Sequence, residues 1–449
     1  MISVIILAAG RGTRMRSQLP KPLCKIGGMS FIENSIERAL ALQPSQVIIV
    51  GSAELFAHSE WQTMFDALNA KTSRLPRFLS DDHPNLINVL QPEALGTGNA
   101  VQMAFPFIQS ERVIIIHVDM PFISVKTLQL LAESKNDLSI TVAKNVDSTS
   151  SFGRVVFQDG VPVEIIEAKN LYEGVEDSGI VNAASYSVSF SCLKTCLSHI
   201  SKNTSGDEYY FTDIVNIAYK RGFKTSCVEI SPNEAIGIDS PEALAHASIQ
   251  LSQILSEQFL EVTFQCLHNV TLSMDTAIGC GSIIEGACAL GRKVVIGKNV
   301  KIHPFCVLDD CIIEDNCEIG PFAHIHKGST IRAGAVIGNF VEVKNSDIGN
   351  NSKAKHLAYV GDALLGVGVN VGAGTVFCNY DGVKKHHSTV ERHASIGANV
   401  SLVAPIHIGK SAYIGAGSVI TKDVPAATLA LSRAPQVHNA EWVRKKKCV

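Results

Sequence analysis

A glycine-rich segment with two basic residues close behind it lies near the start of the chain. Gly10 and Gly12 are followed by Arg14 and Lys21. The backbone N–H groups of a glycine-rich turn bind phosphate, and positively charged side chains neutralise it. The segment has neither the GKS or GKT sequence of a P-loop nor the GxGxxG pattern of a dinucleotide-binding turn. We therefore predict that Arg14 and Lys21 neutralise a triphosphate and its leaving pyrophosphate.

Asp119 occupies a position where a carboxylate can take part in the same chemistry. It follows an apolar segment, residues 112–117, that has the pattern of a buried strand. Ligands bind at the carboxyl ends of parallel strands, and a carboxylate there is a natural ligand for Mg²⁺. We predict that Asp119 holds Mg²⁺. The alternative is an aspartate that caps a helix or ends a turn.

Polar residues of several kinds also gather between residues 338 and 382, where they depart from a six-residue apolar period. They include His356 and the sequence Asn379-Tyr380-Asp381-Gly382, which ends in a strong turn signal. A solenoid scaffold has no need of off-period Lys, His, Asn and Tyr side chains, which therefore indicate a site. An imidazole, with an ordinary pKa of about 6.5, acts as a general base at neutral pH. We predict that His356 is catalytic, against the alternative of a structural histidine.

The elements that position the first group of residues belong to an α/β domain. The apolar segments 3–8, 46–50 and 112–117 alternate with stretches of helical pattern such as 31–42. Alternating strands and helices predict a Rossmann-like domain with a mostly parallel sheet, which we place at residues 1–240.

The elements that position the second group repeat every six residues. Isoleucine, leucine or valine recurs at this interval at Ile313, Ile319, Ile325, Ile331, Ile337 and Val343, and again at Ile396, Leu402, Ile408, Ile414 and Ile420. This period fits a solenoid with one inward aliphatic side chain on each of three faces and about 18 residues per coil. We predict a left-handed parallel β-helix of hexapeptide repeats over residues 263–437, with an irregular, capping register from Leu267 to Val307. An ordinary β-sandwich that contains hexads by chance is the alternative.

The length of the chain also indicates more than one domain. A chain of 449 residues is long for a single hydrophobic core. Its hydrophobic content of 46% with 18% charged residues is typical of a folded globular protein. Between the two predicted domains, residues 241–262 have the pattern of an amphipathic linker helix, and residues 438–449 form a basic C-terminal tail.

Charge and cysteine content argue against several other classes of protein. A net charge of −3 gives no electrostatic reason to expect a nucleic acid or an anionic membrane as a partner. No apolar segment approaches the roughly 20 residues of a membrane span, and the first ten residues lack the features of a signal peptide. The 12 cysteines show no CxxC pair and no zinc-type spacing. We therefore expect a protein of the reducing cytoplasm.

Several of these segments together resemble a known family. LAAGRGTRM, the LPKPL behind it, QPEALGTG from residue 91 and Asp119-Met-Pro resemble the sugar-phosphate nucleotidyltransferases. With the hexapeptide repeats, the chain is similar to the bacterial bifunctional family that joins a glucosamine-1-phosphate N-acetyltransferase to an N-acetylglucosamine-1-phosphate uridyltransferase. The resemblance implies a homotrimer that makes UDP-N-acetylglucosamine, a precursor of peptidoglycan and lipopolysaccharide. Its substrates would be glucosamine 1-phosphate, acetyl-CoA, UTP and the intermediate N-acetylglucosamine 1-phosphate, with Mg²⁺ as cofactor.

The resemblance also implies roles for residues of the N-terminal domain. The site for UTP and UDP-N-acetylglucosamine would comprise Leu7, Ala8, Ala9, Gly10, Lys21, Gln91, Gly96, Thr97, Gly153, Glu167 and Asn182. Arg14 and Lys21 would contact the phosphates. Asp119 and Asp239 would hold Mg²⁺, with Asp239 standing where the family usually has an asparagine.

In the C-terminal domain the resemblance implies an acetyltransferase site shared between neighbouring subunits. His356, supported by Glu342, would take a proton from the amine of glucosamine 1-phosphate. The sugar phosphate would be bound by His326, Lys344, Tyr359, Asn370 and Lys385, and acetyl-CoA by Asn379, Tyr380, Ala398, Ala416 and Arg433.

A few positions depart from the family's pattern. His117-Val118 replaces a Tyr-Gly pair, and Ala183-Ala184 replaces a Thr-Gly pair beside the sugar-binding asparagine. His326 stands in place of a phosphate-binding arginine, and Ala398 in place of a frequent serine. The lost threonine hydroxyl removes a possible hydrogen bond to the sugar, worth about 1 kcal/mol.

Two other functions stay open. One is a sugar-1-phosphate nucleotidyltransferase whose β-helix is only structural or regulatory, and the other is an inactive assembly subunit. The first predicts a plain solenoid, so His356 and Arg433 count against it. The second predicts the loss of Arg14, Lys21 or Asp119, all of which are present.

Overall fold

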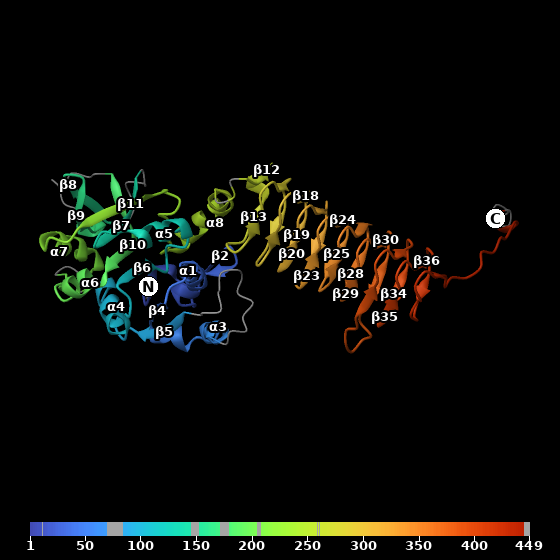
Figure 1. The fold of residues 1–449 in the computed structure, drawn as a ribbon, viewed down its shortest axis with the longest axis horizontal. Coiled ribbons are helices and arrows are strands. Elements are labelled where there is room, and N and C mark those ends of the chain that lie inside the picture. Colours follow the sequence, from blue (N-terminus) through green and yellow to red (C-terminus); the bar gives the residue numbers. More distant parts are fainter. Residues whose placement is uncertain are drawn as a thin grey trace. The chain divides into compact units, whose positions relative to one another are not determined.

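The computed structural model describes residues 1–10, 12–69, 84–144, 152–170, 179–203, 208–257, 259 and 261–443 (Figure 1). The chain forms two compact units, Met1–Gln250 and Leu251–Val449. The last six residues of the predicted basic tail lie outside the described residues, as does the side chain of Lys169.

A mixed, mostly parallel sheet forms the centre of the first unit. In the described part of this unit the sheet has nine strands, seven of them in the order β11-β7-β10-β6-β1-β4-β5. Their bounds are β1 Ile2–Ala8, β4 Gln46–Gly51, β5 Asn85–Leu90, β6 Arg112–His117, β7 Leu138–Lys144, β10 Ile180–Ser189 and β11 Thr225–Ile230. β10 runs antiparallel to both of its neighbours, and the hairpin β8 (Arg154–Gln158) and β9 (Val161–Ile166) pairs with it. A separate two-stranded sheet joins β2 (Lys25–Ile26) and β3 (Met29–Ser30).

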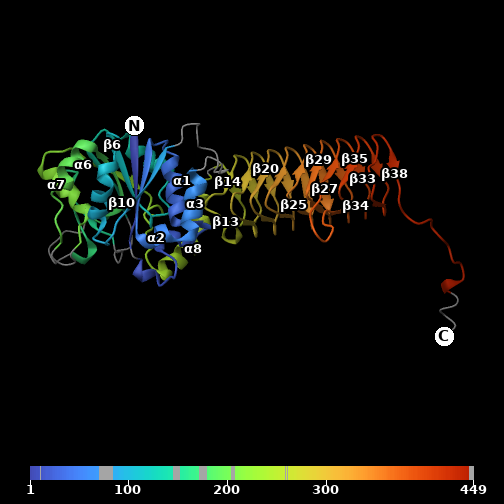
Figure 2. The same cartoon turned by 90° about the horizontal axis from the view of Figure 1, so that it is seen from below.

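Helices cover both faces of this sheet (Figure 2). On one face α4 (Thr97–Ala104), α6 (Phe190–Leu197) and α7 (Ile214–Lys220) pack on a core that includes Ile115 and Tyr186. α1 (Phe31–Leu40) and α5 (Val125–Glu133) contact the central strands as well. The short α2 and α3 span Ala53–Ala57 and Ser59–Asn69.

The predicted strands and helix of this domain are confirmed. Every residue of the segment 3–8 is buried, as are the interiors of β4 and β6, because these strands lie in the middle of a sheet covered on both faces. The Ser30 side chain accepts a hydrogen bond from the N–H of Glu33 and starts α1. The helix ends at Leu40, two residues before the predicted end.

The second unit is a parallel β-helix whose coils are built from three sheets (Figure 2). The first sheet contains β12 Thr263–Phe264, β15 Ile283–Ile284, β18 Lys301–Ile302, β21 Glu318–Ile319, β24 Val336–Asn339, β27 Lys353–His356, β30 Asn370–Val371, β33 Ser395–Ile396, β36 Tyr413–Ile414 and β38 Leu429–Ala430. The second contains β13 Thr271–Leu272, β16 Ala289–Leu290, β19 Val307–Leu308, β22 His324–Ile325, β25 Glu342–Lys344, β28 Tyr359–Gly361, β31 Val376–Cys378, β34 Ser401–Val403 and β37 Val419–Ile420. The third contains β14 Ala277–Ile278, β17 Val295–Ile296, β20 Cys311–Ile313, β23 Ser329–Ile331, β26 Asp347–Ile348, β29 Ala363–Leu365, β32 Ser388–Val390 and β35 Ile406–Ile408. From β12 to β34 each strand pairs with the strand three places further along, so one coil uses one strand from each sheet, and at the end of the first sheet β36 pairs with β38.

The expected irregular register between Leu267 and Val307 is wrong. Thr271 pairs with Ala289 and Ala289 with Val307, which is a regular advance of 18 residues per coil. Aliphatic residues already recur every sixth residue, at Leu272, Ile278, Ile284, Leu290, Ile296, Ile302 and Leu308, and all of them except the half-buried Ile278 are buried. The period is masked in the sequence because additional apolar residues occupy neighbouring hexad positions.

One segment leaves the solenoid between β31 and β32. Tyr380 and Lys385 form an isolated antiparallel bridge, so the segment returns on itself. The Asp381 carboxylate accepts hydrogen bonds from the N–H groups of Val383 and Lys384, and Gly382 has a φ of 96°. The turn predicted at Asp381-Gly382 is therefore present, and it projects polar side chains beyond the coil.

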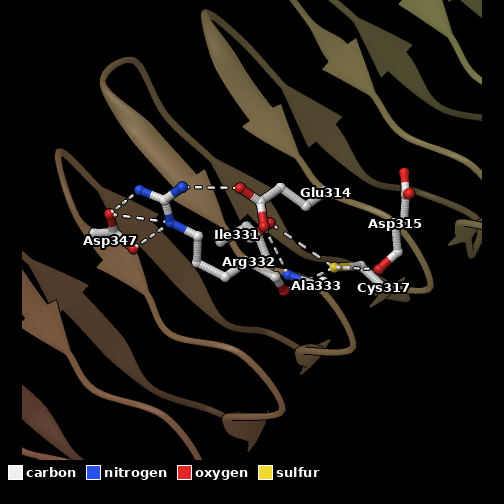
Figure 3. Close-up of polar contacts among 7 residues, drawn as sticks. All are labelled: Glu314, Asp315, Cys317, Ile331, Arg332, Ala333 and Asp347. Carbon is white, nitrogen blue, oxygen red and sulfur yellow. Dashed lines mark hydrogen bonds and ion pairs between the residues drawn. The ribbon is translucent and has the colours of Figure 1, made fainter.

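Arginine and acidic residues connect adjacent coils on the outside of the solenoid (Figure 3). Arg332 lies 2.6 Å from Asp347 and 2.8 Å from Glu314, and these two residues belong to the coils on either side. The Glu314 carboxylate also accepts the N–H of Ala333 at 3.0 Å. The two carboxylates raise the pKa of Arg332. This cluster binds three coils together.

The helix α8 (Pro241–Ser256) occupies most of the predicted linker, and the boundary between the two units falls inside it. Ser252 at its C-terminal end donates to the carbonyl of Val270 at 2.5 Å. None of the helices in the described ranges combines the length and the hydropathy that a membrane crossing requires.

Candidate functional sites

An ion pair joins the loop after β1 to the end of β6. Lys21 Nζ lies 2.6 Å from Asp119 Oδ2, and both side chains are largely buried. Leu7 pairs with His117 in the sheet, and its carbonyl accepts the N–H of Val118 at 3.1 Å. The carboxyl ends of the two strands are thus adjacent. They bring the predicted phosphate-binding lysine and the predicted metal-binding aspartate into one site.

A second ion pair links the same loop to Asp239. Arg14 lies 3.0 Å from Asp239 Oδ2. The N–H of Ile238 donates to the carbonyl of Asp119 at 2.9 Å, which places Asp239 in the segment beside Asp119. Gly12 belongs to the same arrangement, because a Cβ atom there would lie 2.6 Å from the Cβ of Lys21. Two carboxylates and two cations, from three distant segments, therefore meet at this edge of the sheet.

The two aspartates suit a divalent ion that is completed by its substrate. Mg²⁺ prefers oxygen ligands and is usually held by one or two carboxylates together with substrate phosphates and water. Among the described residues, no three His, Cys, Asp or Glu side chains are arranged to enclose a metal ion. Asp119 and Asp239 fit a site in which two carboxylates hold the ion and substrate phosphates and water supply the remaining oxygen ligands.

The charged neighbours set the protonation of Asp119. Burial alone would raise the pKa of its carboxyl, but the charges of Lys21 and His117 and the hydrogen bond from Lys21 lower it below the ordinary value. Asp119 is therefore ionised at neutral pH, as a metal ligand must be.

His117, which replaces the family's tyrosine, lies beside this pair. Burial lowers the pKa of its imidazole, with Lys21 adding to the effect and Asp119 opposing it. Its buried Nε2 atom has no hydrogen-bond partner among the residues that the structure describes. The centroid of its ring lies 6.5 Å from the centroid of the Tyr186 ring. This departure from the family's pattern therefore leaves a buried ring nitrogen that no described residue satisfies.

The predicted uracil-reading turn is held rigidly before α4. Gly96 has a φ of 95°, and a Cβ atom there would lie 2.5 Å from the carbonyl oxygen of Tyr209. Glycine is required for both reasons. Gln91 Nε2 donates to the carbonyl of Gly96 at 3.1 Å, and Thr97 Oγ1 accepts the N–H of Phe211 at 3.0 Å. Gln91 and the Gly96-Thr97 turn are therefore connected to each other and to the segment 209–211.

The three predicted sugar-binding residues meet at the ends of β8, β9 and β10. The N–H of Asn182 donates to the carbonyl of Gly153 at 2.9 Å. A Cβ atom on Gly153 would lie 3.2 Å from the carbonyl oxygen of Ile166, the residue before Glu167. Glu167 accepts a hydrogen bond of 2.6 Å from Thr212.

Ala184 shows a structural consequence of the departure from Thr-Gly. Its φ is 52°, in the left-handed region that glycine tolerates and alanine does not favour. The N–H of Ala184 donates to Asn182 Oδ1 at 3.2 Å, and Asn182 Nδ2 donates to the hydroxyl of Tyr186 at 2.8 Å. Ala184 is thus held in a strained conformation by its hydrogen bond to Asn182, two residues earlier, which is itself fixed by Tyr186.

On the solenoid, the predicted acceptor residues His326, Lys344 and Tyr359 lie in two rows on the outside of the second sheet. His324, Glu342 and Tyr359 are paired in register on successive strands. The residues between the rows, such as Val343, point inward and are fully buried. His326 Nε2 lies 2.8 Å from Glu342 Oε1.

The two histidines of these rows are close to each other. The ring centroids of His324 and His326 are 3.7 Å apart. Burial and the neighbouring His326 lower the pKa of His324, while Glu342 and Asp309 oppose this shift. His326, which stands where the resembled family has an arginine, therefore pairs with the ring of His324 and lies beside the carboxylate of Glu342.

His356 ends β27 at the corner that leads to this face. Its exposed ring has Nδ1 2.9 Å from the Oδ1 of Asn339, its partner in β24. Since an amide oxygen only accepts, Nδ1 carries the proton in this contact and Nε2 keeps its lone pair. Asn339 was missed in the sequence because it lies one coil away from His356. The only signal for it was the spacing of 17 residues, one coil of the repeat.

At the opposite edge of the same face, Asn379 and Tyr359 lie together. Asn379 Nδ2 donates to the Tyr359 hydroxyl at 3.4 Å and to Asp362 Oδ2 at 2.5 Å. Asp362 is 3% exposed and was not predicted as part of the site. A buried aspartate at a solenoid corner between Gly361 and Ala363 gives no sign in the sequence of what it contacts.

The other predicted residues of this domain lie in neighbouring coils. Asn370 is exposed on β30, in the sheet of His356, and Lys385 pairs with Tyr380 at the base of the projecting turn. Arg433 donates to the carbonyl of Ala416 at 2.9 Å, and the carbonyl of Ala398 accepts the N–H of Gly417 at 2.8 Å. Ala398, Ala416 and Arg433 thus form a separate group, and no contact among the described residues joins this group to His356.

Two family models match parts of the chain. Residues 4–150 match the MobA-like NTP transferase domain, and residues 310–345 match the bacterial transferase hexapeptide of six repeats. The first unit therefore carries a nucleotidyltransferase domain, and the second carries repeats of the kind found in bacterial transferases. Both matches indicate that the chain is a transferase.

Two nucleotidyltransferases are among the solved structures that the chain matches. A putative glucose-1-phosphate thymidylyltransferase from Bacillus anthracis is 19% identical, with a TM-score of 0.42 over 55% of this chain and 94% of the other. An inositol-1-phosphate CTP transferase from T. maritima is 16% identical, with a TM-score of 0.42 over 57% of this chain and 95% of the other.

Proposed function

We propose that the chain is a bifunctional enzyme of UDP-N-acetylglucosamine synthesis. The second unit transfers an acetyl group from acetyl-CoA to glucosamine 1-phosphate. The first unit then transfers uridylyl from UTP to N-acetylglucosamine 1-phosphate and releases pyrophosphate. The observation that carries the proposal is the polar site on the solenoid, where an oriented histidine and a hydrogen-bonded Asn379 lie at opposite edges of one outer face.

In acetyl transfer, His356 acts as the general base. Asn339 holds its Nδ1–H, so Nε2 takes the proton from the amine of glucosamine 1-phosphate. The amine nitrogen forms a bond to the thioester carbonyl carbon, the carbon–sulfur bond breaks, and coenzyme A leaves as the thiol or thiolate. Lys344, Asn370 and Lys385 hold the sugar phosphate, and His326 replaces a fixed arginine in that role. The site works in a homotrimer.

In uridylyl transfer, the residues at the end of β1 and β6 bind and orient the triphosphate. Lys21 and Arg14 are paired with carboxylates in this structure, and both move to phosphate oxygens when UTP is present. A phosphate oxygen of N-acetylglucosamine 1-phosphate attacks the α-phosphorus, and the bond to pyrophosphate breaks. Asp119 and Asp239 would hold Mg²⁺, which supplies charge stabilisation for the departing pyrophosphate.

Product analysis tests the proposal. The purified chain is incubated with glucosamine 1-phosphate, acetyl-CoA, UTP and Mg²⁺, and the products are identified by mass. We expect UDP-N-acetylglucosamine. If supplied N-acetylglucosamine 1-phosphate is uridylylated but nothing is acetylated, the β-helix has only a structural or regulatory role and the bifunctional proposal fails. If N-acetylglucosamine 1-phosphate accumulates without a nucleotide sugar, the first unit uses a different substrate.

A further inference from the structure

We infer that Asp362 is a positioning residue of the acetyl-transfer site, acting through Asn379. The inference rests on the proposed function and adds a residue to it. Asp362 lies at a corner of the solenoid directly beneath the projecting turn that carries Tyr380 and Lys385. It is almost completely buried, and a buried carboxylate is costly unless hydrogen bonds satisfy it.

Both oxygens of this carboxylate are occupied by side-chain amides. Asn345 Nδ2 donates to Oδ1 at 2.6 Å, and Asn379 Nδ2 donates to Oδ2 at 2.5 Å. The backbone of Asp362 takes part as well, since its carbonyl accepts the N–H of Ser388 at 3.1 Å, just after the projecting turn. Asp362 therefore contacts both ends of this turn.

The carboxylate determines which way the Asn379 amide points. An ionised carboxylate only accepts hydrogen bonds, so the nitrogen of Asn379, and not its oxygen, must face Asp362. The second N–H of the same nitrogen is directed to the Tyr359 hydroxyl. With both N–H groups used, Oδ1 is the polar atom left for a ligand, and no described residue donates to it.

An acceptor oxygen at this place matches the chemistry of the amine. The attacking nitrogen of glucosamine 1-phosphate carries N–H groups, and Asn379 Oδ1 accepts one of them and orients the lone pair toward the thioester. The Tyr359 hydroxyl, which accepts from Asn379, keeps its own proton to donate. Asp362 thus fixes Asn379 Oδ1 as an acceptor and the Tyr359 hydroxyl as a donor, without contacting the substrate itself.

Replacing Asp362 by asparagine isolates this effect because the shape is kept. In Asp362→Asn, the new Oδ1 still accepts from Asn345, so its NH₂ group faces Asn379 and forces that amide to turn over. We expect kcat/KM for glucosamine 1-phosphate to fall by about 10–100-fold, while the KM for acetyl-CoA changes little and uridylyl transfer is unchanged. The double variant Asp362→Asn with Asn379→Asp reverses the donor and the acceptor. It presents an acceptor oxygen to the substrate again, so it should recover part of the loss.

Asp310 provides the matched control. It is an aspartate at the equivalent corner three coils earlier, with a φ of 43° against 49° for Asp362. Its N–H donates to the carbonyl of Arg292 in the preceding coil at 2.7 Å, as the N–H of Asp362 donates to the carbonyl of Lys344 at 3.0 Å. Asp310→Asn should leave acetyl transfer unchanged.

Several results would overturn the inference. One is wild-type kinetics in Asp362→Asn. The others are an equal loss of activity in Asp310→Asn and no recovery of activity in the double variant. Either of these last two results would mean that Asp362 only stabilises the fold. If Asp362→Asn does not fold, Asn379→Asp alone decides. That variant places two carboxylates together, so its acetyl transfer relative to that of the wild type should decrease as the pH rises and both carboxylates ionise. An unchanged ratio across the pH range would contradict us. If the wild type transfers no acetyl group, the inference falls together with the proposed function.

Discussion

His356 Nδ1 lies 2.9 Å from Asn339 Oδ1, one coil away in the same parallel sheet. His356 lies on a strand whose backbone is already fixed by its neighbours in the sheet. The contact with Asn339 leaves Nε2 as the nitrogen that accepts a proton. The repeat of the solenoid, and not the local sequence, therefore prepares the imidazole for its proposed role.

Substitution of His356 separates the two proposed activities. We expect His356→Ala to lower acetyl transfer by about 10²–10⁴-fold, because the general base is lost, and to leave pyrophosphate release from UTP unchanged. Asn339→Ala should have a smaller effect on the same step, since it frees the ring without removing it. Both rates are measured on the same preparation. Equal acetylation by wild type and His356→Ala would exclude this residue as the base.

Asp119→Asn should have the opposite pattern. It removes the charge that would hold Mg²⁺ and leaves Lys21 without its carboxylate partner. We expect uridylyl transfer to fall by at least about 10²-fold while acetyl transfer is retained. The acetyl-transfer rate is the internal control for folding. Uridylyl transfer at the wild-type rate would show that the metal ligand is elsewhere.

Ala184→Gly should stabilise the first unit. Alanine at a φ of 52° is strained, and glycine removes the strain at some cost in chain entropy. The net gain in the free energy of unfolding should be about 0.5–1 kcal/mol, measured by denaturant unfolding. Ala183→Gly is the matched control, because Ala183 is fully buried and no such strain is present there. It should destabilise, and a gain in both variants would mean that backbone strain at Ala184 is not the cause.

Arg332→Met tests the cluster that binds three coils together. The arginine contacts Glu314 and Asp347 while its side chain is 40% exposed, so solvent screens the two pairs. We expect a loss of about 1 kcal/mol in the free energy of unfolding, smaller at high salt, with both activities retained. A change in acetyl transfer at unchanged stability would instead connect this cluster to the site.

Asp213 should make stability depend on pH. Burial, followed by the charges of Glu167 and Glu164, raises its pKa from 3.8 to about 6. Between these values the folded chain binds more protons than the unfolded chain, so this residue's contribution to stability is lost as the pH rises from about 4 to 6. Asp213→Asn removes the titration.

The comparison is made by thermal unfolding of the wild type and of Asp213→Asn at pH 4.5 and pH 7.5 (roughly one pH unit or more from the raised pKa). The variant should gain in Tm relative to the wild type at the higher pH. Asp159→Asn, in the exposed turn between β8 and β9, serves as the control and should show no such difference. If the Tm difference of Asp213→Asn is the same at both pH values, the raised pKa is not coupled to folding.

The sequence by itself determined the two kinds of fold and much of the candidate chemistry. Continuous apolar segments predicted the central strands, and the six-residue period predicted the β-helix, because both patterns depend on which residues are buried locally. The basic loop and Asp119 were recognisable because each stands directly beside such an element.

Only the tertiary structure decided how these residues meet. Three contacts, between Lys21 and Asp119, His356 and Asn339, and Asp362 and Asn379, each join residues that are 17 or more positions apart. The regular register before Val307 was hidden for a related reason, since burial and not residue type distinguishes the inward position of each hexad. Periodicity reports which side of an element is buried, whereas a hydrogen bond between coils depends on how those elements stack.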